Sequence, residues 1–317
     1  MAVACGSHHT LAVAEEGQIL VSGWGERGRL ALGDTQDRLR MTRLAGDFTV
    51  RVVMVSTGWG HSALQDSDGE LWMCGRGANG QLGTGGREDM LTPTRVPKWQ
   101  FGGARVKMAA CGHSHTLVLT EAGRVWAFGR GLFGQLGTGN QDERTEPTEV
   151  VGLLGVTITF VAAGFNHSVA VSGEGGIFTW GLGYDGRLGH GGQEIELQPR
   201  NVEAGCFGAD TVVQAAAGAG HTAAVTAEGR LYTWGDGFFG QLGQGTREMR
   251  LVPTLVPAEG LKGSALLMVA CGVSHTLAVT RAGALYACGR GYYGQLCLSD
   301  KANGDVFELV RLPDTTP

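Results

Sequence analysis

Proline and charge are both scarce in this sequence. Only 8 of its 317 residues are proline, and charged residues make up 17% of the chain, below the roughly 25% that is usual for soluble domains. So little proline excludes a collagen-like chain or a proline-rich disordered chain. With 43% hydrophobic residues, the chain has enough apolar surface to fold.

Long apolar runs are absent as well. No stretch approaches the roughly 18 residues that a membrane-spanning helix requires. The first residues, Met-Ala-Val-Ala-Cys-Gly, have neither the basic region nor the long apolar region of a signal peptide. We therefore expect no membrane partner and an intracellular protein, cytoplasmic or nuclear.

A basic surface and cysteine pairs are also missing. The chain has 25 Lys and Arg against 30 Asp and Glu, a net charge of −5, so we do not expect nucleic acid as a partner. The seven cysteines lie in apolar runs such as Met108–Cys111 and not at metal-ligand spacings. We expect them to be reduced core residues.

Glycine, by contrast, is abundant. The chain has 55 glycines, about 17% of its residues, against a usual share of about 7%. Because glycine adopts positive φ at little cost, it is favoured in tight turns. The composition therefore predicts many short strands joined by turns.

Two signatures recur along the chain. A histidine follows a glycine by three residues at His9, His61, His115, His167, His221 and His275, at intervals of 52 to 54 residues. A Gly-x-x-Gly-Gln-Leu-Gly loop is clearest at Gly77–Gly83, Gly131–Gly137 and Gly237–Gly243. Six repeats of about 53 residues account for the sequence.

Each repeat has the pattern of four strands. In the third repeat these are Ala104–Ala110, His115–Thr120, Arg124–Phe128 and a looser segment at Pro147–Val150. A four-stranded antiparallel sheet copied around an axis is a β-propeller blade, because each sheet then buries both faces against its neighbours. The sequence therefore predicts an all-β protein, a single domain over residues 1–317 with six four-stranded blades.

These repeats resemble a known family. The string Val-Ala-Cys-Gly-Val-Ser-His-Thr-Leu-Ala-Val-Thr at 269–280, followed by Gly289-Arg290-Gly291 and Gly294-Gln295-Leu296, resembles the repeat of the regulator of chromosome condensation family. The resemblance covers essentially the whole chain and implies a β-propeller. Since the family usually has seven blades, seven is the alternative to six, and we expect the segment Val306–Leu312 to close a six-bladed ring.

The repeated histidines are expected to be structural. Their spacing places one in each blade, so they cannot share a metal ion, whose ligands lie within about 2.1 Å of one centre. We expect each imidazole to hydrogen-bond the backbone of its own turn. The Gly-x-Gly-x-x-Gly match at Gly129–Gly134 leads into a strand and not a helix, so it is no dinucleotide site. We predict no catalytic residue, cofactor or metal, and a protein that is not an enzyme.

One end of the propeller is the candidate for function. The strand order places the Gly-x-x-His turns and the Gly-x-x-Gly loops at the same end, where aromatic and arginine side chains gather, as they do in protein interfaces. The hairpins at the opposite end are acidic, with Glu121 and Glu228 among them. The residues predicted to bind a partner are Trp24, Trp59, Arg76, Arg130, Phe165, Tyr184, Phe238, Arg290 and Tyr292.

Three functions follow from the resemblance. The main prediction is a protein-interaction module, as in family members within large ubiquitin ligases and ciliary proteins. The first alternative is guanine-nucleotide exchange on a Ran-like small GTPase, in which a protruding loop displaces nucleotide. The repeat spacings vary by only two residues, which argues against such an insertion. The second alternative is an ultraviolet-B photoreceptor-like homodimer, which uses clustered turn tryptophans where this chain has Trp59 alone.

Overall fold

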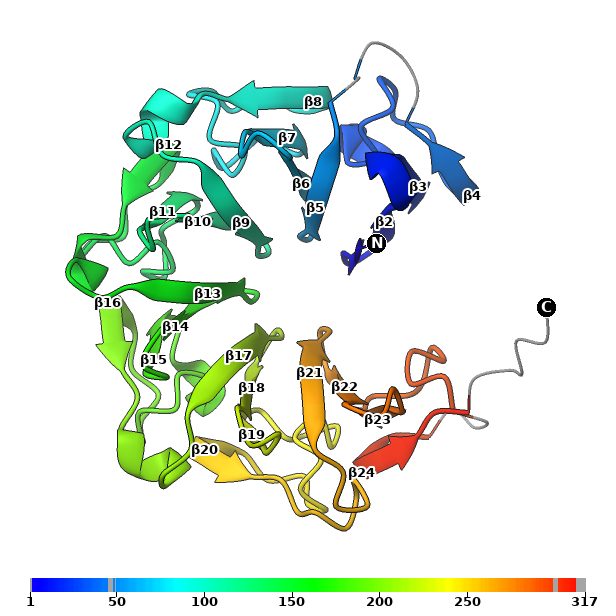
Figure 1. Cartoon of the computed structure of the whole chain (residues 1–317), viewed down its shortest axis with the longest axis vertical. Coiled ribbons are helices and arrows are strands. Elements are labelled where there is room, and N and C mark those ends of the chain that lie inside the picture. The colour runs from blue at the N-terminus through cyan, green and yellow to red at the C-terminus, as the bar shows by residue number, and fades with distance from the viewer. Residues whose placement is uncertain (1, 45–47, 49, 299–301, 312–317) are drawn as a thin grey trace.

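A computed structural model describes residues 2–44, 48, 50–298 and 302–311. In these residues the chain forms six four-stranded antiparallel sheets, and within each sheet every strand pairs with the next along the chain. The sheets stand around a central axis as the blades of a propeller (Figure 1). This confirms the predicted all-β fold of six four-stranded blades.

The blades follow one another in sequence. Blade 1 comprises β1 (Ala2–Cys5), β2 (His9–Val13), β3 (Ile19–Gly23) and β4 (Arg38–Arg43), and blade 2 comprises β5 (Val52–Thr57), β6 (His61–Asp66), β7 (Leu71–Gly75) and β8 (Met90–Val96). Blade 3 comprises β9 (Val106–Cys111), β10 (His115–Thr120), β11 (Val125–Gly129) and β12 (Arg144–Glu149), and blade 4 comprises β13 (Ile158–Ala163), β14 (His167–Ser172), β15 (Ile177–Gly181) and β16 (Glu196–Asn201). Blade 5 comprises β17 (Val212–Ala217), β18 (His221–Thr226), β19 (Leu231–Gly235) and β20 (Arg250–Leu255), and blade 6 comprises β21 (Leu266–Cys271), β22 (His275–Thr280), β23 (Leu285–Gly289) and β24 (Gly304–Leu309).

The helices in the described residues are all short 3-10 helices. They lie at Glu15–Gly17, Glu26–Gly28, Lys98–Phe101, Val151–Leu153, Tyr184–Gly186 and Ala204–Phe207. None of the helices in the described part of the chain is long and apolar enough to cross a membrane.

The hydrophobic core lies between blades, at boundaries that we call seams. In the seam between blades 4 and 5, Val169 and Ile177 of blade 4 pack with Val212 and Trp234 of blade 5. Trp180 and Trp234 are fully buried, and their indole N–H groups donate to main-chain oxygens of the preceding blade, Trp180 to Gln135 at 3.0 Å and Trp234 to Arg187 at 2.9 Å. Each blade is therefore held by its neighbours.

The turn histidines link consecutive blades. At five seams the histidine Nε2 forms a hydrogen bond with the Ser or Thr hydroxyl that follows the histidine of the next blade; the pairs are His9–Ser62, His61–Thr116, His115–Ser168, His167–Thr222 and His221–Thr276, at 2.8 to 3.0 Å. The expected bond to the backbone of the histidine's own turn was therefore wrong. The reason is the direction of the side chain, which crosses the seam and finds a hydroxyl about 54 residues further along the chain.

The glycine that opens each turn leaves no room for a side chain. At Gly164 an ideal Cβ would lie 2.3 Å from Cε1 of His167 and 2.6 Å from the main-chain oxygen of Gly218 in the next blade. Such distances are shorter than real Cβ contacts. The glycine is thus required by close packing of the turn against the neighbouring blade.

The ring is open between blades 6 and 1 (Figure 1). Residues 306–309, which we expected to help close the ring, lie in β24, and β24 pairs with β23 as the outer strand of its own blade. Since β24 completes blade 6, it does not pair with blade 1, and that expectation was wrong. Leu312, the end of the expected closing segment, lies outside the described residues.

Candidate protein-interaction face

The Gly-x-x-His turns and the Gly-x-x-Gly loops lie at the same end of the propeller, which we call the loop face. In blade 3 the N–H of Arg130 donates to the main-chain oxygen of Ser114 at 2.8 Å, and in blade 5 the N–H of Asp236 donates to that of Gly220 at the same distance. These bonds join each loop to the turn of its own blade. The predicted arrangement of the two signatures is confirmed.

The loops are rigidly built from within. In blades 3 and 5 the buried Gln135 and Gln241 accept hydrogen bonds at Oε1 from the N–H groups of Phe133 and Phe239, each at 2.8 Å. A Cβ at Gly131 would lie 1.9 Å from the main-chain oxygen of Asp142, so the chain crosses itself closely there. The side chains at the tips of the loops are therefore displayed from a fixed backbone.

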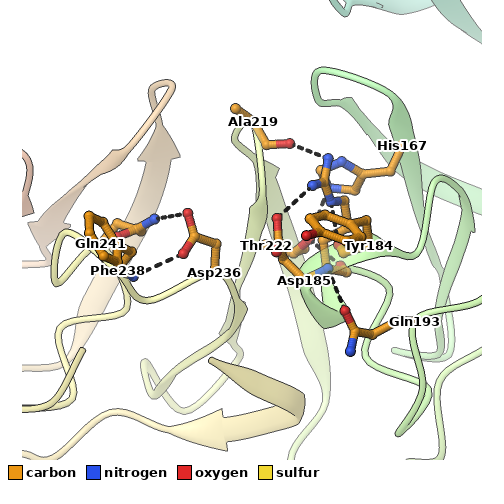
Figure 2. Close-up of polar contacts among 10 residues, drawn as sticks. His167, Tyr184, Asp185, Gln193, Ala219, Thr222, Asp236, Phe238 and Gln241 are labelled. Atoms are coloured by element: carbon orange, nitrogen blue, oxygen red, sulfur yellow. Dashed lines mark hydrogen bonds and ion pairs between the residues drawn. The ribbon is translucent and has the colours of Figure 1, made fainter. Parts of the chain in front are cut away.

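Blade 4 has Arg187 where most other blades have this glutamine. Its Nε donates to the main-chain oxygen of Tyr184 at 2.7 Å, and its Nη2 donates to Oδ2 of Asp185 at 3.0 Å. Its Nη1 crosses the seam and donates to the main-chain oxygen of Ala219 at 2.6 Å. Figure 2 shows Tyr184 and Asp185 beside Ala219 and Thr222 of blade 5. Arg187 thus fixes the blade 4 loop and joins it to the next turn.

Burial shifts the pKa values of this ion pair. Desolvation lowers the pKa of Arg187 below its usual value, although the Asp185 carboxylate opposes that shift. Desolvation also raises the pKa of Asp185; nearby Asp236 adds to the rise, and Arg187 opposes it. Burial of the two charged groups is unfavourable, and the hydrogen bonds of Arg187 offset part of that desolvation cost.

In blade 5 an aspartate orders the loop that carries Phe238. Oδ1 of Asp236 accepts from the N–H of Phe238 at 2.9 Å, and Oδ2 accepts from Nε2 of Gln241 at 2.8 Å (Figure 2). The Phe238 ring meets Phe239 edge to face, with 4.9 Å between centroids. Phe238 still exposes 68% of its surface, so it projects from an ordered loop.

Blades 1 to 4 share a row of stacked rings. The Trp59 and His113 ring centroids lie 5.0 Å apart, and those of His113 and Phe165 lie 3.9 Å apart. At the other end of the row, the guanidinium carbon of Arg29 lies 4.5 Å from the Trp24 ring centroid and 5.9 Å from that of Trp59. Neighbouring turns are therefore joined by aromatic and cation–π contacts along the surface.

Cationic groups surround His113 in this row. Burial is the larger cause and the positive charges of Arg76 and Arg130 add to it, so that together they lower the pKa of His113 to about 4. The imidazole is consequently neutral near pH 7. It is a flat, uncharged ring between Trp59 and Phe165.

Three arginines stand at the same position of their loops, in blades 2, 3 and 6. The guanidinium carbon lies 5.4 Å from the Trp59 ring centroid in Arg76, 5.8 Å from that of Phe133 in Arg130 and 5.1 Å from that of Phe239 in Arg290. Within the described ranges, none of the three forms an ion pair with a carboxylate. Their positive charge is available to a partner.

The centre of the loop face is a shallow hollow of about 130 Å³. It is lined mainly by the Gly-x-x-His turns of the six blades, with Trp59, His113 and Phe165 among them. No three His, Cys, Asp or Glu side chains in the described part of the chain are arranged to hold a metal ion. The hollow is lined by turn glycines, small side chains and the three rings.

All nine residues predicted to bind a partner lie in these turns and loops. Tyr184, Phe238 and Tyr292 are the most exposed of them, at 62%, 68% and 63%, whereas Trp59 and Phe165 are half-buried in the row of rings. Their role in binding remains a prediction.

Sequence reasoning missed Arg29 and Arg187. Both occupy a loop position that is glutamine in the other four blades, and that departure from the repeat was the available signal.

At the opposite end of the propeller, Glu121 and Glu228 are exposed as expected. Asp66, however, is buried and accepts a bond from the Trp72 indole at 2.9 Å, so it does not add to an acidic surface.

Comparisons with known proteins agree with this geometry. Residues 1–223 match the sequence model of the RCC1-like domain, and residues 228–279, 212–241 and 269–295 match models of the regulator of chromosome condensation (RCC1) repeat. The ultraviolet-B receptor UVR8 of Arabidopsis thaliana is 36% identical over 312 residues, which are 98% of this chain and 70% of that protein. The secretion-regulating guanine nucleotide exchange factor of Bos taurus is 33% identical over 298 residues, 91% of this chain; the chain spans 63% of that relative's length.

A solved structure gives the same result. Human WBSCR16 matches with a TM-score of 0.88 at 26% identity, over 99% of this chain and 82% of that one. The domain match alone covers more than half of the sequence, and the repeat matches continue it toward the C-terminal end. The chain belongs to the RCC1-like family of β-propellers, built from regulator of chromosome condensation repeats.

Proposed function

We propose that this protein is an interaction module that binds a partner protein through the loop face. The observation that carries the proposal is the set of exposed aromatic side chains, Tyr184, Phe238 and Tyr292, on an ordered surface. Exposed apolar groups of this size are unfavourable in water unless a partner covers them. A rigid backbone lowers the entropy cost of binding, so such groups become effective anchors.

The charged groups of the loop face are unevenly distributed among the blades, which would favour one orientation of the partner. Arg76 and Arg130 on blades 2 and 3 lack carboxylate partners within the described ranges, whereas blades 4 and 5 carry Asp185 and Asp236. Arginine pairs with carboxylates through two parallel hydrogen bonds. Arg290 of blade 6 is a third such cation. A partner with acidic groups over blades 2, 3 and 6 and apolar groups over Tyr184, Phe238 and Tyr292 would match this pattern.

The test compares two double variants of the intact propeller. Phe238→Ala with Arg130→Ala removes one aromatic anchor and one free cation, and we expect affinity for a captured partner to fall more than tenfold with an unchanged melting temperature. Glu121→Lys with Glu228→Lys reverses charge on the opposite hairpins and should leave affinity nearly unchanged. If the hairpin variant alone abolished binding, the partner would lie at the acidic end and the proposal would fail.

Guanine-nucleotide exchange is the second candidate. It is favoured by the 33% identity with a secretion-regulating guanine nucleotide exchange factor over most of this chain. Release of labelled GDP from a Ran-like GTPase, measured with and without the intact propeller, tests it. Acceleration that is lost in the Phe238→Ala and Arg130→Ala variant would make the GTPase the partner of the loop face.

The photoreceptor-like homodimer has less support. Trp59 is the single tryptophan in the six Gly-x-x-His turns. Trp24 of blade 1 and Trp59 both contact the Arg29 guanidinium, and no direct ring contact between the two is found in the described residues. Size-exclusion chromatography before and after ultraviolet-B illumination tests this alternative.

A further inference from the structure

Two seams of the loop face are built around an arginine. In the seam between blades 4 and 5, Arg187 donates from Nε to the main-chain oxygen of Tyr184 at 2.7 Å and from Nη1 to that of Ala219 at 2.6 Å. Its Nη2 donates to Oδ2 of Asp185 at 3.0 Å, and the charge of Asp236 in blade 5 also favours the protonated guanidinium (Figure 2). The arginine of this seam therefore has two carboxylates near it.

The seam between blades 1 and 2 has the same backbone contacts around Arg29. Nε of Arg29 donates to the main-chain oxygen of Glu26 at 2.8 Å, and Nη1 donates across the seam to that of Trp59 at 3.2 Å. Nη2, by contrast, forms no hydrogen bond within the described residues, and Oε2 of Glu26 lies 3.5 Å from it. The Arg29 side chain is fully buried, so this N–H group lacks the acceptor that its counterpart in Arg187 has.

Arginines also replace the two carboxylates of the other seam. Arg27 stands where blade 4 has Asp185, and both residues have a positive φ, of 62° and 60°. Arg76 stands where blade 5 has Asp236, directly after the glycine that ends the third strand. Arg27 is paired with Asp89 at 3.0 Å. Arg76 has no carboxylate partner in the described part of the chain, and its Nε is buried without a hydrogen bond there. Positive charge thus occupies the positions of negative charge.

A glycine in the turn of blade 2 brings the two arginines to one place. A Cβ at Gly60 would lie 3.4 Å from Cβ of Arg76 and 3.9 Å from Nη2 of Arg29. Blades 3 and 6 have a serine at this position. Blade 5 has Gly220, where a Cβ would lie 3.4 Å from Oδ2 of Asp185. The same point of the turn is therefore next to a carboxylate in one seam and next to two guanidinium groups in the other.

The positive charge continues onto blade 3. The charges of Arg76 and Arg130 both act on the His113 imidazole, so the two guanidinium groups lie near one ring. Nδ1 of His113 shares a hydrogen bond of 2.8 Å with Oγ of Ser114, which leaves Nε2 to a ligand. Since Arg76 and Arg130 have no carboxylate partners among the described residues, two positive charges of this cluster are uncompensated. Like charges held close together oppose each other, and an anion placed between them is stabilised.

We propose that Arg76, Arg130 and His113 bind a phosphate monoester carried by a side chain of the partner protein, with Arg29 buried behind them. A phosphate monoester has a charge of about −1.5 to −2 at pH 7, which matches the two uncompensated guanidinium groups. It also supplies the charge that two carboxylates supply in the seam between blades 4 and 5. Its three oxygens accept charge-assisted hydrogen bonds from separate donors, whereas a carboxylate offers two oxygens. The inference rests on the proposed function, because it names the group of the partner that meets blades 2 and 3.

A phosphorylated protein matches this face better than a nucleic acid does. The cluster is confined to blades 1 to 3, and blades 4 and 5 of the same face carry Asp185 and Asp236. Carboxylates there repel a phosphate backbone that runs across the face. A single phosphate on a protein side chain meets the arginines without crossing the aspartates.

The first test uses a defined probe with the full chain. The peptide acetyl-Gly-Gly-phosphoserine-Gly-Gly-amide is titrated into isotope-labelled protein at pH 7.5, and the Trp59 indole N–H signal is followed by NMR. We expect a dissociation constant of about 1 mM, which is typical of one small charged group on an open surface. The same peptide with glutamate in place of phosphoserine should bind at least about tenfold more weakly, and the peptide with serine should cause no shift.

Variants locate the site of binding. Arg76→Asp introduces the residue that blade 5 has at this position, and it should weaken binding of the phosphopeptide at least about tenfold. Arg130→Gln is a second variant that removes one charge and should weaken binding in the same direction. The matched control is Arg87→Ala, which removes an exposed arginine of blade 2 that is already paired with Glu143 at 2.7 Å. This control should leave the affinity unchanged, and the melting temperature of each variant is measured beside it.

A captured partner provides the second test. Phosphatase treatment of the partner should weaken its binding to the propeller at least about tenfold, and Arg76→Asp should remove the difference between treated and untreated partner. If phosphatase has no effect while Phe238→Ala with Arg130→Ala still weakens binding, the phosphate inference is wrong and the proposed function stands. If the phosphopeptide binds at Arg76 but the partner does not need Phe238, the proposed function fails and the phosphate site remains.

Three results with the probe would overturn the inference. The first is that the phosphopeptide does not shift the Trp59 signal, or shifts it equally in the Arg76→Asp variant. The second is that the glutamate peptide binds as tightly as the phosphopeptide. The third is that inorganic phosphate or a single-stranded oligonucleotide binds more tightly than the phosphopeptide, which would assign the cluster to a free anion or to a nucleic acid.

Discussion

His167 and His275 hold the same place in the repeat but lie in different surroundings. Each follows a Gly-x-x turn, and each pairs across its hairpin with the glycine that ends the third strand, Gly181 or Gly289. His167 is fully buried and bonds Thr222 of the next blade at 3.0 Å, whereas His275 is partly exposed and has no such bond in the described structure. The sequence of one repeat therefore determines the strand pairing of its blade, whereas the burial and hydrogen bonding of the histidine depend on the neighbouring blade.

Acid should have the largest effect, through the five seam histidines together. Burial lowers the pKa of His9, His61, His115 and His221 to about 3, and that of His167 well below its usual value. The unfolded chain takes up these protons below about pH 6.5 and the fold does not, so stability is full above that pH and falls as pH decreases, by about 1.4 kcal/mol per pH unit for each histidine. We expect the urea midpoint to drop steeply between pH 7 and pH 5.

The same measurement distinguishes the five seams with a histidine hydrogen bond from the uncovered side of blade 6, where His275 lies. His115→Gln should reduce the slope of stability against pH by about one proton. His275→Gln should reduce it less, since burial of His275 is less complete. A urea midpoint that is flat from pH 7 to pH 5 would show that the histidines are not held neutral in the fold.

The turn glycines should show the next largest difference. Gly164→Val places a side chain against the main-chain oxygen of Gly218 in the next blade, and we expect a loss of at least about 1–3 kcal/mol in the free energy of unfolding. At Gly272 the close contacts are with the ring of His275, which no hydrogen bond holds in the described structure. Gly272→Val should therefore cost less in urea denaturation. If both variants lost the same free energy of unfolding, contact with the neighbouring blade would not be the reason that Gly164 is required.

Truncation of the histidines should give a smaller contrast. His167→Ala removes a buried hydrogen bond and leaves a cavity, with an expected cost of about 2 kcal/mol or more. His275→Ala removes a partly exposed ring, and we expect less than about 1 kcal/mol. Thermal unfolding of the two variants at pH 7.5 is the measurement. A cost at His275 that matched the cost at His167 would indicate a closed ring in solution.

The smallest effect is expected at the outer strand. Leu39→Ser changes a side chain that is 98% exposed, so the free energy of unfolding should stay within about 0.5 kcal/mol. Leu91→Ser, at the same position of blade 2, removes packing against the loop of blade 1 and should cost more. Chemical denaturation of both variants gives the comparison, and a large loss at Leu39 would show that this surface is covered.

The blades themselves were predictable because their signals are local. The spacing of His115 and Gly123 within one repeat places a strand, a hairpin and the next strand, and that order puts Arg130 and Phe238 at one end of the propeller. Close packing at Gly164 was predictable for the same reason, since a glycine fixed in a repeated turn points to a site without room for a side chain.

Contacts between blades were not predictable from the repeat. Nothing in one repeat says that His61 bonds Thr116, because the partner belongs to the next repeat and the choice depends on how two sheets face each other. The bond from Arg187 to Ala219 escaped the sequence analysis for that reason. The opening between blades 6 and 1 was missed because the number of repeats predicts the number of blades but not the angle between neighbouring blades.

The fluorescence of the two fully buried tryptophans can report on the packing of the interior seams. Trp180 and Trp234 lie in the seams between blades 3 and 4 and between blades 4 and 5, away from the two end blades. In a linear array of repeats, stability is a sum of terms between neighbours, so the end blades, with one neighbour each, open first. The blue-shifted emission of these two indoles therefore reports the last part of the array to unfold, while fraying of blades 1 and 6 passes with little change in their signal.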